Sequence, residues 1–293
     1  MQDFKGRTAF VTGGASGIGL GIAQALARQG AQVAIADINE THLAEAVATA
    51  ADAEIVLRPY KLDVTDRTAH ADVADAVERD LGPVTIVALN AGLGVIGRIQ
   101  DAGYDDWDWI MGVNLGGVIN GVRTFVPRIR GHGLGGHVVA TSSMGGLVVA
   151  DSGGIYSAAK AGVIAMMRCL RADLEKEGIG VSVLCPAAVN TNIHQHYDMR
   201  PSSYSDAHYS LSPEELEQLK AMLAMGMDPA KVGDLVIEGI RANAEFIMTH
   251  GMLAPVVEMR RDAILASLPD EPKNEARWQA DLMARRFMDQ SLA

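Results

Sequence analysis

Short apolar runs alternate with longer segments of helical spacing along most of this chain. The runs are unbroken stretches of Val, Ile, Leu and Ala without polar alternation, which is typical of strands covered on both faces. They predict seven strands, at residues 8–12, 33–37, 55–62, 84–90, 137–142, 181–185 and 246–249. The intervening segments predict helices at residues 18–29, 40–50, 67–81, 104–129, 156–177 and 229–243.

This alternation predicts the fold class: an α/β protein with a Rossmann-type, doubly wound parallel sheet of about seven strands, built from right-handed βαβ units. We expect a single Rossmann-fold domain over residues 1–293. Residues 192–228 are rich in Ser, Tyr, His, Pro and Met, with a short helix near 213–225, and are expected to form a substrate-binding insertion at the sheet edge. Residues 253–293 have helix-like apolar spacing followed by a polar, Arg-containing segment, and are expected to form a C-terminal extension.

The composition of the 293 residues, 48% hydrophobic and 21% charged, supports a sizeable core. The net charge of -11 makes an acidic surface that repels phosphate backbones, so nucleic acid is not an expected partner. Clusters of Lys and Arg suited to an anionic membrane are missing from the sequence, as are a leader-like apolar segment and an apolar run of about 18 residues. We therefore expect no membrane partner and a cytoplasmic location. Cys169 and Cys185 stand in apolar runs and are expected to be buried, reduced thiols.

The sequence TGGASGIG at positions 12–19 lies between the first predicted strand and the first predicted helix. Gly13 permits a tight turn, Gly17 permits close approach to a pyrophosphate, and Gly19 permits close packing of helix on strand. The helix that follows directs its positive end at the phosphates. We expect a dinucleotide cofactor here, bound by Gly13, Ser16, Gly17, Ile18 and Gly19.

Asp37 ends the second predicted strand, about twenty residues past the glycine loop, as the dinucleotide fingerprint requires. A carboxylate there accepts hydrogen bonds from the ribose hydroxyls and repels a 2′-phosphate. The next residue, Ile38, and the residue before Gly17, Ser16, offer that phosphate no basic group. The predicted cofactor is therefore NAD rather than NADP.

The sequence YSAAK at 156–160 places a phenol and an ammonium four residues apart, on one face of a helix. A tyrosine with its ordinary pKa near 10 is a poor base at neutral pH. A neighbouring Lys160 ammonium and a cationic nicotinamide would lower the pKa of Tyr156, so that it could accept a hydroxyl proton while hydride leaves the same carbon. Ser143, at the end of a predicted strand, can hold the substrate oxygen. These three residues are candidate catalytic groups.

Together these motifs resemble the short-chain dehydrogenase/reductase family, from about residue 4 to about residue 250. The resemblance implies that Asn114 joins Ser143, Tyr156 and Lys160 in the catalytic set, holding a water for proton relay. It further implies cofactor contacts from Asp63 and Val64 at the adenine, from Asn90, Ala91 and Gly92 beside the cofactor, from Val189 and Thr191 at the nicotinamide carboxamide, and from Tyr156 and Lys160. Two residues depart from the family pattern: Leu89 replaces the first Asn of the Asn-Asn-Ala-Gly motif, and Ala187 replaces a glycine after Pro186.

The segment 104–114, the Arg200-Pro201 pair and the insertion at 192–228 resemble the bacterial Cα-dehydrogenases of lignin catabolism. That resemblance implies a small aromatic alcohol as substrate: the benzylic hydroxyl of an arylglycerol-β-aryl ether such as guaiacylglycerol-β-guaiacyl ether, oxidised to the α-ketone. A two-ring substrate needs a large apolar pocket. Side chains on segments that could line it are Met144, Val149, Ile193, Tyr197, Met199, Tyr204 and Tyr209. His194 and His196 have no nearby Cys or carboxylate to complete a metal set, so no metal is expected.

Two other functions stay open on the sequence. One is an NAD(P)-dependent carbonyl reductase or hydroxysteroid-type dehydrogenase for another bulky alcohol. The other is a catalytically silent nucleotide-binding scaffold, which predicts a damaged catalytic set, whereas all four residues are present here. In the family, the helices near 104–130 and 156–177 usually form oligomer interfaces, so a homodimer or homotetramer is expected.

Overall fold

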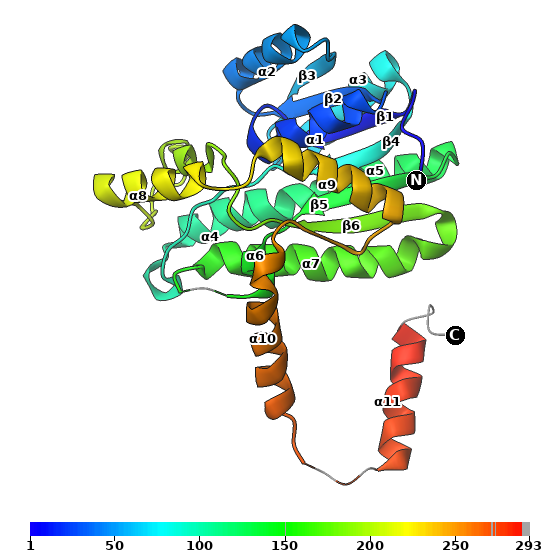
Figure 1. Ribbon diagram of the computed structural model, residues 1–293, viewed down its shortest axis with the longest axis vertical. Helices are drawn as coiled ribbons and strands as arrows, with labels where there is room; N and C mark the ends of the chain where they lie inside the picture. The colour runs from blue at the N-terminus through cyan, green and yellow to red at the C-terminus, as the bar shows by residue number, and fades with distance from the viewer. Residues whose placement is uncertain (150, 271, 273, 289–293) are drawn as a thin grey trace.

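The computed structural model describes residues 1–149, 151–270, 272 and 274–288. Its strands form one parallel sheet in the order β3-β2-β1-β4-β5-β6-β7, which confirms the predicted Rossmann-type fold (Figure 1). The strands are β1 Thr8–Thr12, β2 Gln32–Asp37, β3 Leu57–Lys61, β4 Val84–Leu89, β5 Gly136–Thr141, β6 Ile179–Cys185 and β7 Phe246–Met248. The edge strand β3 is shorter than expected and contains Pro59, which a sheet tolerates at its edge.

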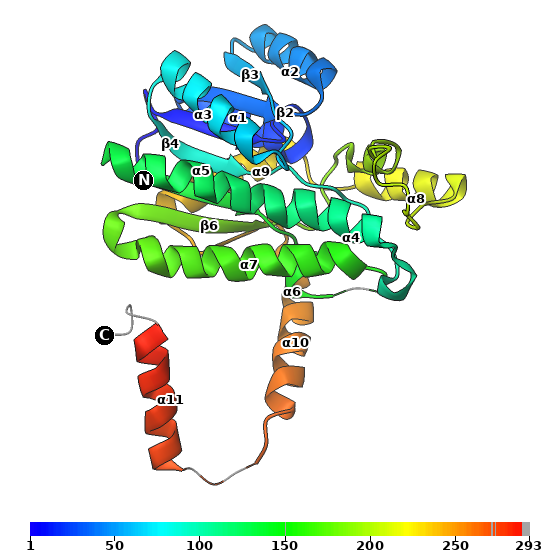
Figure 2. The same ribbon diagram turned by 180° about the vertical axis from the view of Figure 1, so that it is seen from behind.

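One face of the sheet is covered by α1 (Gly17–Arg28), α2 (Glu40–Asp52) and α9 (Pro229–Ala242), seen in front in Figure 1. Their apolar residues share a core with the strands. The opposite face is covered by α3 (Arg67–Leu81), α5 (Gly117–His132) and α7 (Gly154–Leu174), seen in front in Figure 2. There the rings of Phe10 and Phe125 lie 4.6 Å apart, joining β1 to α5. The fold is thus a sheet between two helical layers.

The segment predicted as one helix at 104–129 contains an irregular turn. It consists of α4 (Tyr104–Met111), a π-helical turn η2 (Gly112–Gly116) and α5. Hydrophobic spacing does not reveal a π turn, since the apolar stripe continues on both sides of it. Short elements that the pattern also missed are α6 (Met144–Leu147) and the 3₁₀ turns η1 (Ile99–Asp101), η3 (Glu175–Glu177), η4 (Ile193–Asp198) and η5 (Gly251–Leu253).

Beyond β6 the chain forms η4 and α8 (Pro213–Ala224), the short helix expected near 213–225. After β7, α10 (Ala254–Ala266) and α11 (Glu275–Met288) extend away from the sheet (Figures 1 and 2). Among the described residues, no helix has the length and apolarity needed to cross a bilayer. Both cysteines are free: Cys185 is buried as expected, but Cys169 is exposed, because it lies on the outer face of α7.

A buried histidine in β5 gives the fold a predictable acid sensitivity. His137 is fully buried, its Nε2 lies 2.8 Å from Ser182 Oγ, and burial lowers its pKa to about 3. The unfolded chain takes up this proton near the ordinary pKa of 6.5, so stability is lost as pH falls from there toward 3. The loss amounts to about 5 kcal/mol when complete.

We therefore expect that Tm, measured by circular dichroism, decreases less in His137→Gln than in the parent protein when the pH is lowered from about 6.5 to 4. His208→Gln, at an exposed histidine, is the matched control and should leave the profile unchanged. An equal acid dependence of Tm in both variants would contradict this assignment.

Candidate active site

The site lies where the strand order reverses, at the carboxyl ends of the adjacent strands β1 and β4, the usual ligand crevice of an open parallel sheet. A cavity of about 560 Å³ opens there. Every residue predicted for the site lines it except Gly19 and Asn114, which lie behind its wall. The topology therefore brings the predicted site residues together from eight separate stretches of chain.

The glycine loop after β1 is compact and closes against β4. Gly13 has a φ of +62°, a left-handed conformation that suits glycine, and its carbonyl accepts a bond of 3.4 Å from Asn90 Nδ2. A Cβ on Gly19 would stand 1.9 Å from the Gly13 carbonyl oxygen, so no side chain fits there. Ser16 and Ile18 bring the amino end of α1 to the cavity, the arrangement that favours phosphate groups.

A set of hydrogen bonds connects the glycine loop to the neighbouring strands. Thr12 Oγ1 accepts from the backbone N–H of Asn90 at 2.9 Å and of Ala91 at 3.1 Å. Thr141 Oγ1 donates to Asn90 Oδ1 at 3.0 Å. Asn90 thus joins the ends of β1, β4 and β5 and fixes the floor of the cavity, which explains why the replacement at Leu89, a buried core residue, is tolerated.

Asp37 stands at the end of β2 with its carboxylate fixed by backbone groups. Its Oδ1 accepts from Asn39 N–H at 3.1 Å and its Oδ2 from Ala15 N–H at 3.4 Å. Burial raises the pKa of Asp37, and those two bonds and the nearby His42 counter the rise. The neighbouring Ile38 is half exposed and also faces the cavity.

Further along the groove, the loops after β3 and β6 supply the remaining predicted contacts. Asp63 Oδ1 accepts from Thr65 N–H at 2.9 Å, and the Val64 carbonyl accepts from Asn120 Nδ2 at 2.9 Å, which fixes the loop after β3. After β6, Val189 is buried in a β-bridge with Met227, and Thr191 packs against Gly17. The loop after β6 keeps this geometry with Ala187, whose N–H donates to Thr249 Oγ1 at 3.2 Å.

Ser143, Tyr156 and Lys160 form one cluster at the cavity floor. Ser143 caps α6, its Oγ accepting from Gly145 N–H at 3.0 Å, and it hydrogen-bonds with Tyr156. The Lys160 ammonium lies 5.8 Å from the centre of the Tyr156 ring and donates to the Thr141 carbonyl at 2.9 Å. Serine, phenol and ammonium therefore meet at one point of the cavity.

The electrostatics of this cluster differ from the sequence expectation. Burial raises the pKa of Tyr156, and the bond with Ser143 only partly offsets the rise. Burial also lowers the pKa of Lys160 to about 8. The chain alone therefore does not lower the pKa of Tyr156, because desolvation outweighs the hydrogen bond with Ser143.

Asn114 lies on the π turn and is fully buried beside this cluster. Its Oδ1 accepts from Leu93 N–H at 2.6 Å and its Nδ2 donates to the Leu93 carbonyl at 3.0 Å. A Cβ on Gly92 would lie 2.9 Å from Asn114 Oδ1 and 3.1 Å from Lys160 Nζ, so a side chain at this position would collide with both groups. Single π turns occur frequently at functional sites, and here the turn aims Asn114 at the strand β4 loop.

Comparison with known proteins decides the family. The profile of the short chain dehydrogenase family matches residues 7–201. The chain belongs to the short-chain dehydrogenases. It is 39% identical over 269 residues to a C alpha-dehydrogenase from Sphingobium sp. strain SYK-6, covering 92% of this chain and 88% of that relative.

Solved structures support the same family assignment. A short-chain dehydrogenase from Novosphingobium aromaticivorans is 37% identical with a TM-score of 0.82, covering 99% of this chain and 100% of its own. Another from Burkholderia phymatum, solved in complex with NAD, is 32% identical with a TM-score of 0.85, covering 94% and 100%. This dehydrogenase is therefore an oxidoreductase that acts on CH–OH groups with a nicotinamide cofactor.

The residues of this short-chain dehydrogenase fit such a cofactor. Gly13 and Gly92 let the loops around the cavity pack closely, since a Cβ would lie 2.8 Å from Ala91 Cα at Gly13 and 2.9 Å from Asn114 Oδ1 at Gly92. The cavity bounded by these loops is here called the cradle. The cradle runs from Asp37 at one end to the Tyr156 and Lys160 cluster at the other. Within the described residues, no group of three or more His, Cys, Asp or Glu could hold a metal ion.

The substrate end of the dehydrogenase cavity was only partly predicted. Of the expected lining residues, Ile193, Met199 and Tyr204 line it. The other four do not: Met144 is a buried residue of α6, Val149 is exposed, and the hydroxyls of Tyr197 and Tyr209 bond to the backbone of Ile96 and Arg98. Lining residues that the sequence did not predict include Trp109 of α4 and four residues of the 192–228 segment, His196, Leu219, Met222 and Leu223.

An ion pair connects the 192–228 segment to α4. Asp106 is fully buried, and its carboxylate meets the Arg200 guanidinium at 2.6 Å and accepts from His208 N–H at 2.8 Å and Gly103 N–H at 3.0 Å. Burial alone would raise the pKa of Asp106, but these bonds hold it below its ordinary value. The guanidinium also lies 4.8 Å from the centre of the Trp109 ring, which lines the cavity. The pair therefore sets the position of one substrate wall.

Replacing this arginine should affect large substrates selectively. Arg200→Met leaves the Asp106 charge buried without its partner, so the segment that carries Met199 and Tyr204 is expected to shift. We expect KM to rise about tenfold for a two-ring alcohol and to change little for a small secondary alcohol. Initial-rate measurements on both substrates check this, with Arg79→Met on exposed α3 as control. An equal rise in KM for both substrates would show a general structural role only.

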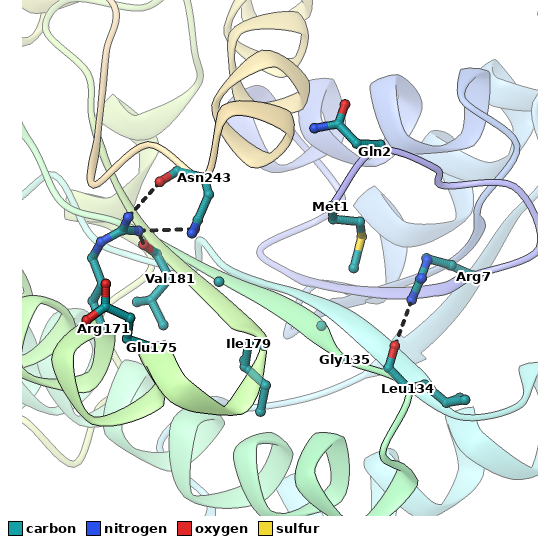
Figure 3. A pocket seen from close by; sticks show the side chains of 13 residues that line it. Met1, Gln2, Arg7, Leu134, Gly135, Arg171, Glu175, Ile179, Val181 and Asn243 are labelled. Carbon is teal, nitrogen blue, oxygen red and sulfur yellow. Dashed lines mark hydrogen bonds between the residues drawn. The ribbon is translucent and has the colours of Figure 1, made fainter. Parts of the chain in front are cut away.

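A second hollow, of about 290 Å³, lies at the opposite edge of the sheet, where β5 and β6 begin (Figure 3). Its two arginines are already engaged. Arg171 donates to the Val181 carbonyl at 2.6 Å and to the Asn243 carbonyl at 2.7 Å, and Arg7 donates to the Leu134 carbonyl at 3.4 Å. None of the predicted site residues lies there, so the dehydrogenase chemistry belongs to the first cavity.

Proposed function

We propose that this chain is an NAD-dependent dehydrogenase that oxidises the benzylic secondary alcohol of an arylglycerol-β-aryl ether to the corresponding α-ketone. The observation that carries the proposal is the Ser143, Tyr156 and Lys160 cluster at the floor of a cavity whose other end is mainly apolar. The 39% identity to a C alpha-dehydrogenase over nearly the whole chain supports the same substrate class.

The shape of the cavity suits a bulky aromatic alcohol. Its substrate end is lined by aliphatic, sulfur-containing and aromatic side chains, with His196 as a polar group. His196 Nδ1 lies 3.2 Å from the Gly94 N–H and accepts from it, and burial lowers the pKa of the imidazole to about 4. A neutral imidazole whose Nδ1 accepts must carry its proton on Nε2, so it offers one fixed donor to an oxygen-rich substrate.

In the proposed reaction each side chain of the cluster has a separate task. Ser143 Oγ holds the substrate hydroxyl beside Tyr156, and the Tyr156 oxygen accepts the hydroxyl proton. Lys160 supplies positive charge next to the phenolate, and Asn114 keeps the adjoining loop after β4 in place. NAD, when bound, supplies the acceptor for the hydride from the same carbon. Burial raises the pKa of Tyr156 and so disfavours its phenolate form. The positive charge of the bound nicotinamide would have to lower this pKa.

Asp37 supports NAD rather than NADP in this proposal. The carboxylate occupies the end of β2, and the cavity-lining residues of the described chain include no arginine that could bind a 2′-phosphate. The lining lysine, Lys160, lies at the catalytic end. A 2′-phosphate would meet the negative charge of Asp37 at this end of the cavity.

We expect Asp37→Asn to lower kcat/KM with NAD roughly 10- to 100-fold and to narrow the gap to NADP, the loss expected for hydrogen bonds to a charged group. Initial rates with both cofactors measure the ratio. Glu40→Gln, a nearby exposed carboxylate paired with Lys61, is the matched control. An unchanged cofactor ratio in Asp37→Asn would show that the ribose is recognised by another group.

The direct test of the function is NADH formation when the purified protein meets NAD and guaiacylglycerol-β-guaiacyl ether. NADP and small secondary alcohols are assayed in parallel, and the α-ketone is identified by mass spectrometry. Rapid turnover of the ether with NAD supports the whole proposal. Turnover of small alcohols alone would exclude the ether as the substrate. Faster ketone reduction with NADPH would favour the carbonyl reductase alternative.

A further inference from the structure

The imidazole of His196 brings one unused hydrogen-bond donor to the substrate end of the cavity. The Gly94 N–H donates to its Nδ1 at 3.2 Å, so the proton of the neutral ring is on Nε2. None of the described residues hydrogen-bonds with Nε2, and this nitrogen is accessible instead of sealed in the interior. The protein therefore leaves the Nε2–H of His196 for a group that enters the cavity.

This donor is held in place before any substrate arrives. The turn η4, which carries His196, contacts the loop after β4 at two further points. The Tyr197 hydroxyl accepts from the Ile96 N–H at 3.0 Å and donates to the Ile96 carbonyl at 3.2 Å. A Cβ on Gly94 would lie 2.6 Å from Ile193 Cγ1, so η4 packs directly on this loop. A donor fixed in this way binds its acceptor at a lower cost in conformational entropy.

The same loop connects the donor to the catalytic cluster. A Cβ on Gly92 would lie 3.1 Å from Lys160 Nζ, while Gly94, two residues further, bonds to His196. These two glycines are at most about 7 Å apart, because an extended chain advances about 3.6 Å per residue. His196 therefore stands beside the catalytic end of the pocket. A substrate whose carbinol lies at the cluster brings the atoms next to that carbinol toward the donor, and its distant ring lies further along the cavity.

The neighbouring side chains make an unpaired donor costly. The lining residues of the 192–228 segment around His196 are mostly aliphatic or sulfur-containing: Ile193, Met199, Leu219, Met222 and Leu223. A bulky substrate displaces water from these side chains and from Nε2 together. If the substrate has no acceptor for Nε2–H, the donor loses its water without replacement. A site of this kind discriminates against an analogue that lacks the acceptor.

We propose that His196 is a specificity-determining residue: its Nε2–H donates to an oxygen on the carbon next to the reacting carbinol. The enzyme then selects alcohols that carry an ether or hydroxyl oxygen on that neighbouring carbon. This inference rests on the proposed function, in which the acceptor is the β-ether oxygen. His196 takes no part in the transfer of the proton or the hydride.

The test compares two alcohols of the same shape. In 2-phenoxy-1-phenylethanol an ether oxygen stands on the carbon next to the carbinol, and in 1,3-diphenylpropan-1-ol a methylene group replaces it. The quantity measured is the ratio of kcat/KM for the ether to kcat/KM for the carbon analogue, with NAD as cofactor. A change of this ratio between variants cancels the intrinsic difference in reactivity of the two alcohols.

Two substitutions of His196 separate its two nitrogens. In His196→Asn the amide takes the place of Nδ1 and can still accept from Gly94, but it does not reach the place of Nε2. We expect the ratio to fall about 10- to 100-fold, mainly through a higher KM for the ether. In His196→Gln the amide reaches the place of Nε2 and can donate there, so most of the ratio should be retained. His208→Asn, at an exposed histidine of the same segment, is the matched control and should keep the parent ratio.

Each outcome bears on the proposal. An equal loss on both alcohols in His196→Asn would show a structural role only, and a parent ratio retained in that variant would exclude the hydrogen bond. Both results would overturn the inference. Turnover of these two alcohols without turnover of guaiacylglycerol-β-guaiacyl ether would refute the proposed substrate alone, since the ratio still reports on His196. Turnover of neither alcohol by the parent protein would overturn both proposals.

Discussion

Tyr156→Phe is expected to lower kcat roughly 1,000-fold or more while the dissociation constant for NAD stays within a few-fold of the parent value. The change removes one oxygen atom, and with it the group that can accept the substrate proton. The ring stays in place between Ser143 and Lys160, so the cavity keeps its shape. Turnover is followed by NADH absorbance and cofactor binding by calorimetry.

Tyr60→Phe is the matched control for this variant. The Tyr60 hydroxyl lies at the surface, 3.0 Å from Asp80, and burial together with that bond raises its pKa to about 12. Removing it should leave kcat unchanged. Substantial turnover by Tyr156→Phe would assign the proton to another group, and loss of NAD binding would show a structural effect instead.

Lys160→Met is expected to give the second largest effect, a fall in kcat of roughly 100- to 1,000-fold near neutral pH. Methionine fills a similar volume, and burial already disfavours the ammonium, whose pKa is lowered to about 8, so the variant should fold normally. Burial raises the pKa of Tyr156, and the variant removes the positive charge that would stabilise its phenolate when Lys160 is protonated. The rate should therefore recover as pH rises and the phenol ionises.

The pH profile of kcat separates this role from a structural one. A profile displaced toward alkaline pH supports electrostatic assistance from Lys160, whereas a uniform loss at every pH means that the lysine acts in another way. Lys61→Met, at an exposed lysine paired with Glu40, supplies the control with the same chemical change.

The sequence predicted the sheet and the cofactor half of the site because both depend on local patterns. Continuous apolar runs mark strands buried on both faces, and the glycine spacing is fixed by contacts such as that of Gly19 with the Gly13 carbonyl. The topology then brings Asp37, Asn90 and Thr191 to one cavity. Such patterns involve residues close together in the sequence, so they can be recognised without knowledge of the three-dimensional fold.

The substrate half could not be predicted in the same way, since its contacts join distant segments. Asp106 and Arg200 are 94 positions apart, and a helical aspartate followed by tryptophan gives no sign that it will be fully buried. The direction of the pKa of Tyr156 was also missed, because residue spacing indicates a nearby charge but not how deeply both groups are desolvated. Burial is a property of the assembled fold.

The π turn at Gly112–Gly116 has a consequence for how this enzyme can change during evolution. A π turn holds one residue more than an α turn, so deleting a single residue there would leave a regular helix instead of a gap. That repair would rotate α4 by about 100° relative to α5, since each residue of an α-helix turns the chain by that angle. Asp106 and Trp109 would leave the substrate wall while Asn114 lost Leu93. A one-residue deletion that preserves the helix would thus abolish the pocket, and viable length variation has to fall outside this turn.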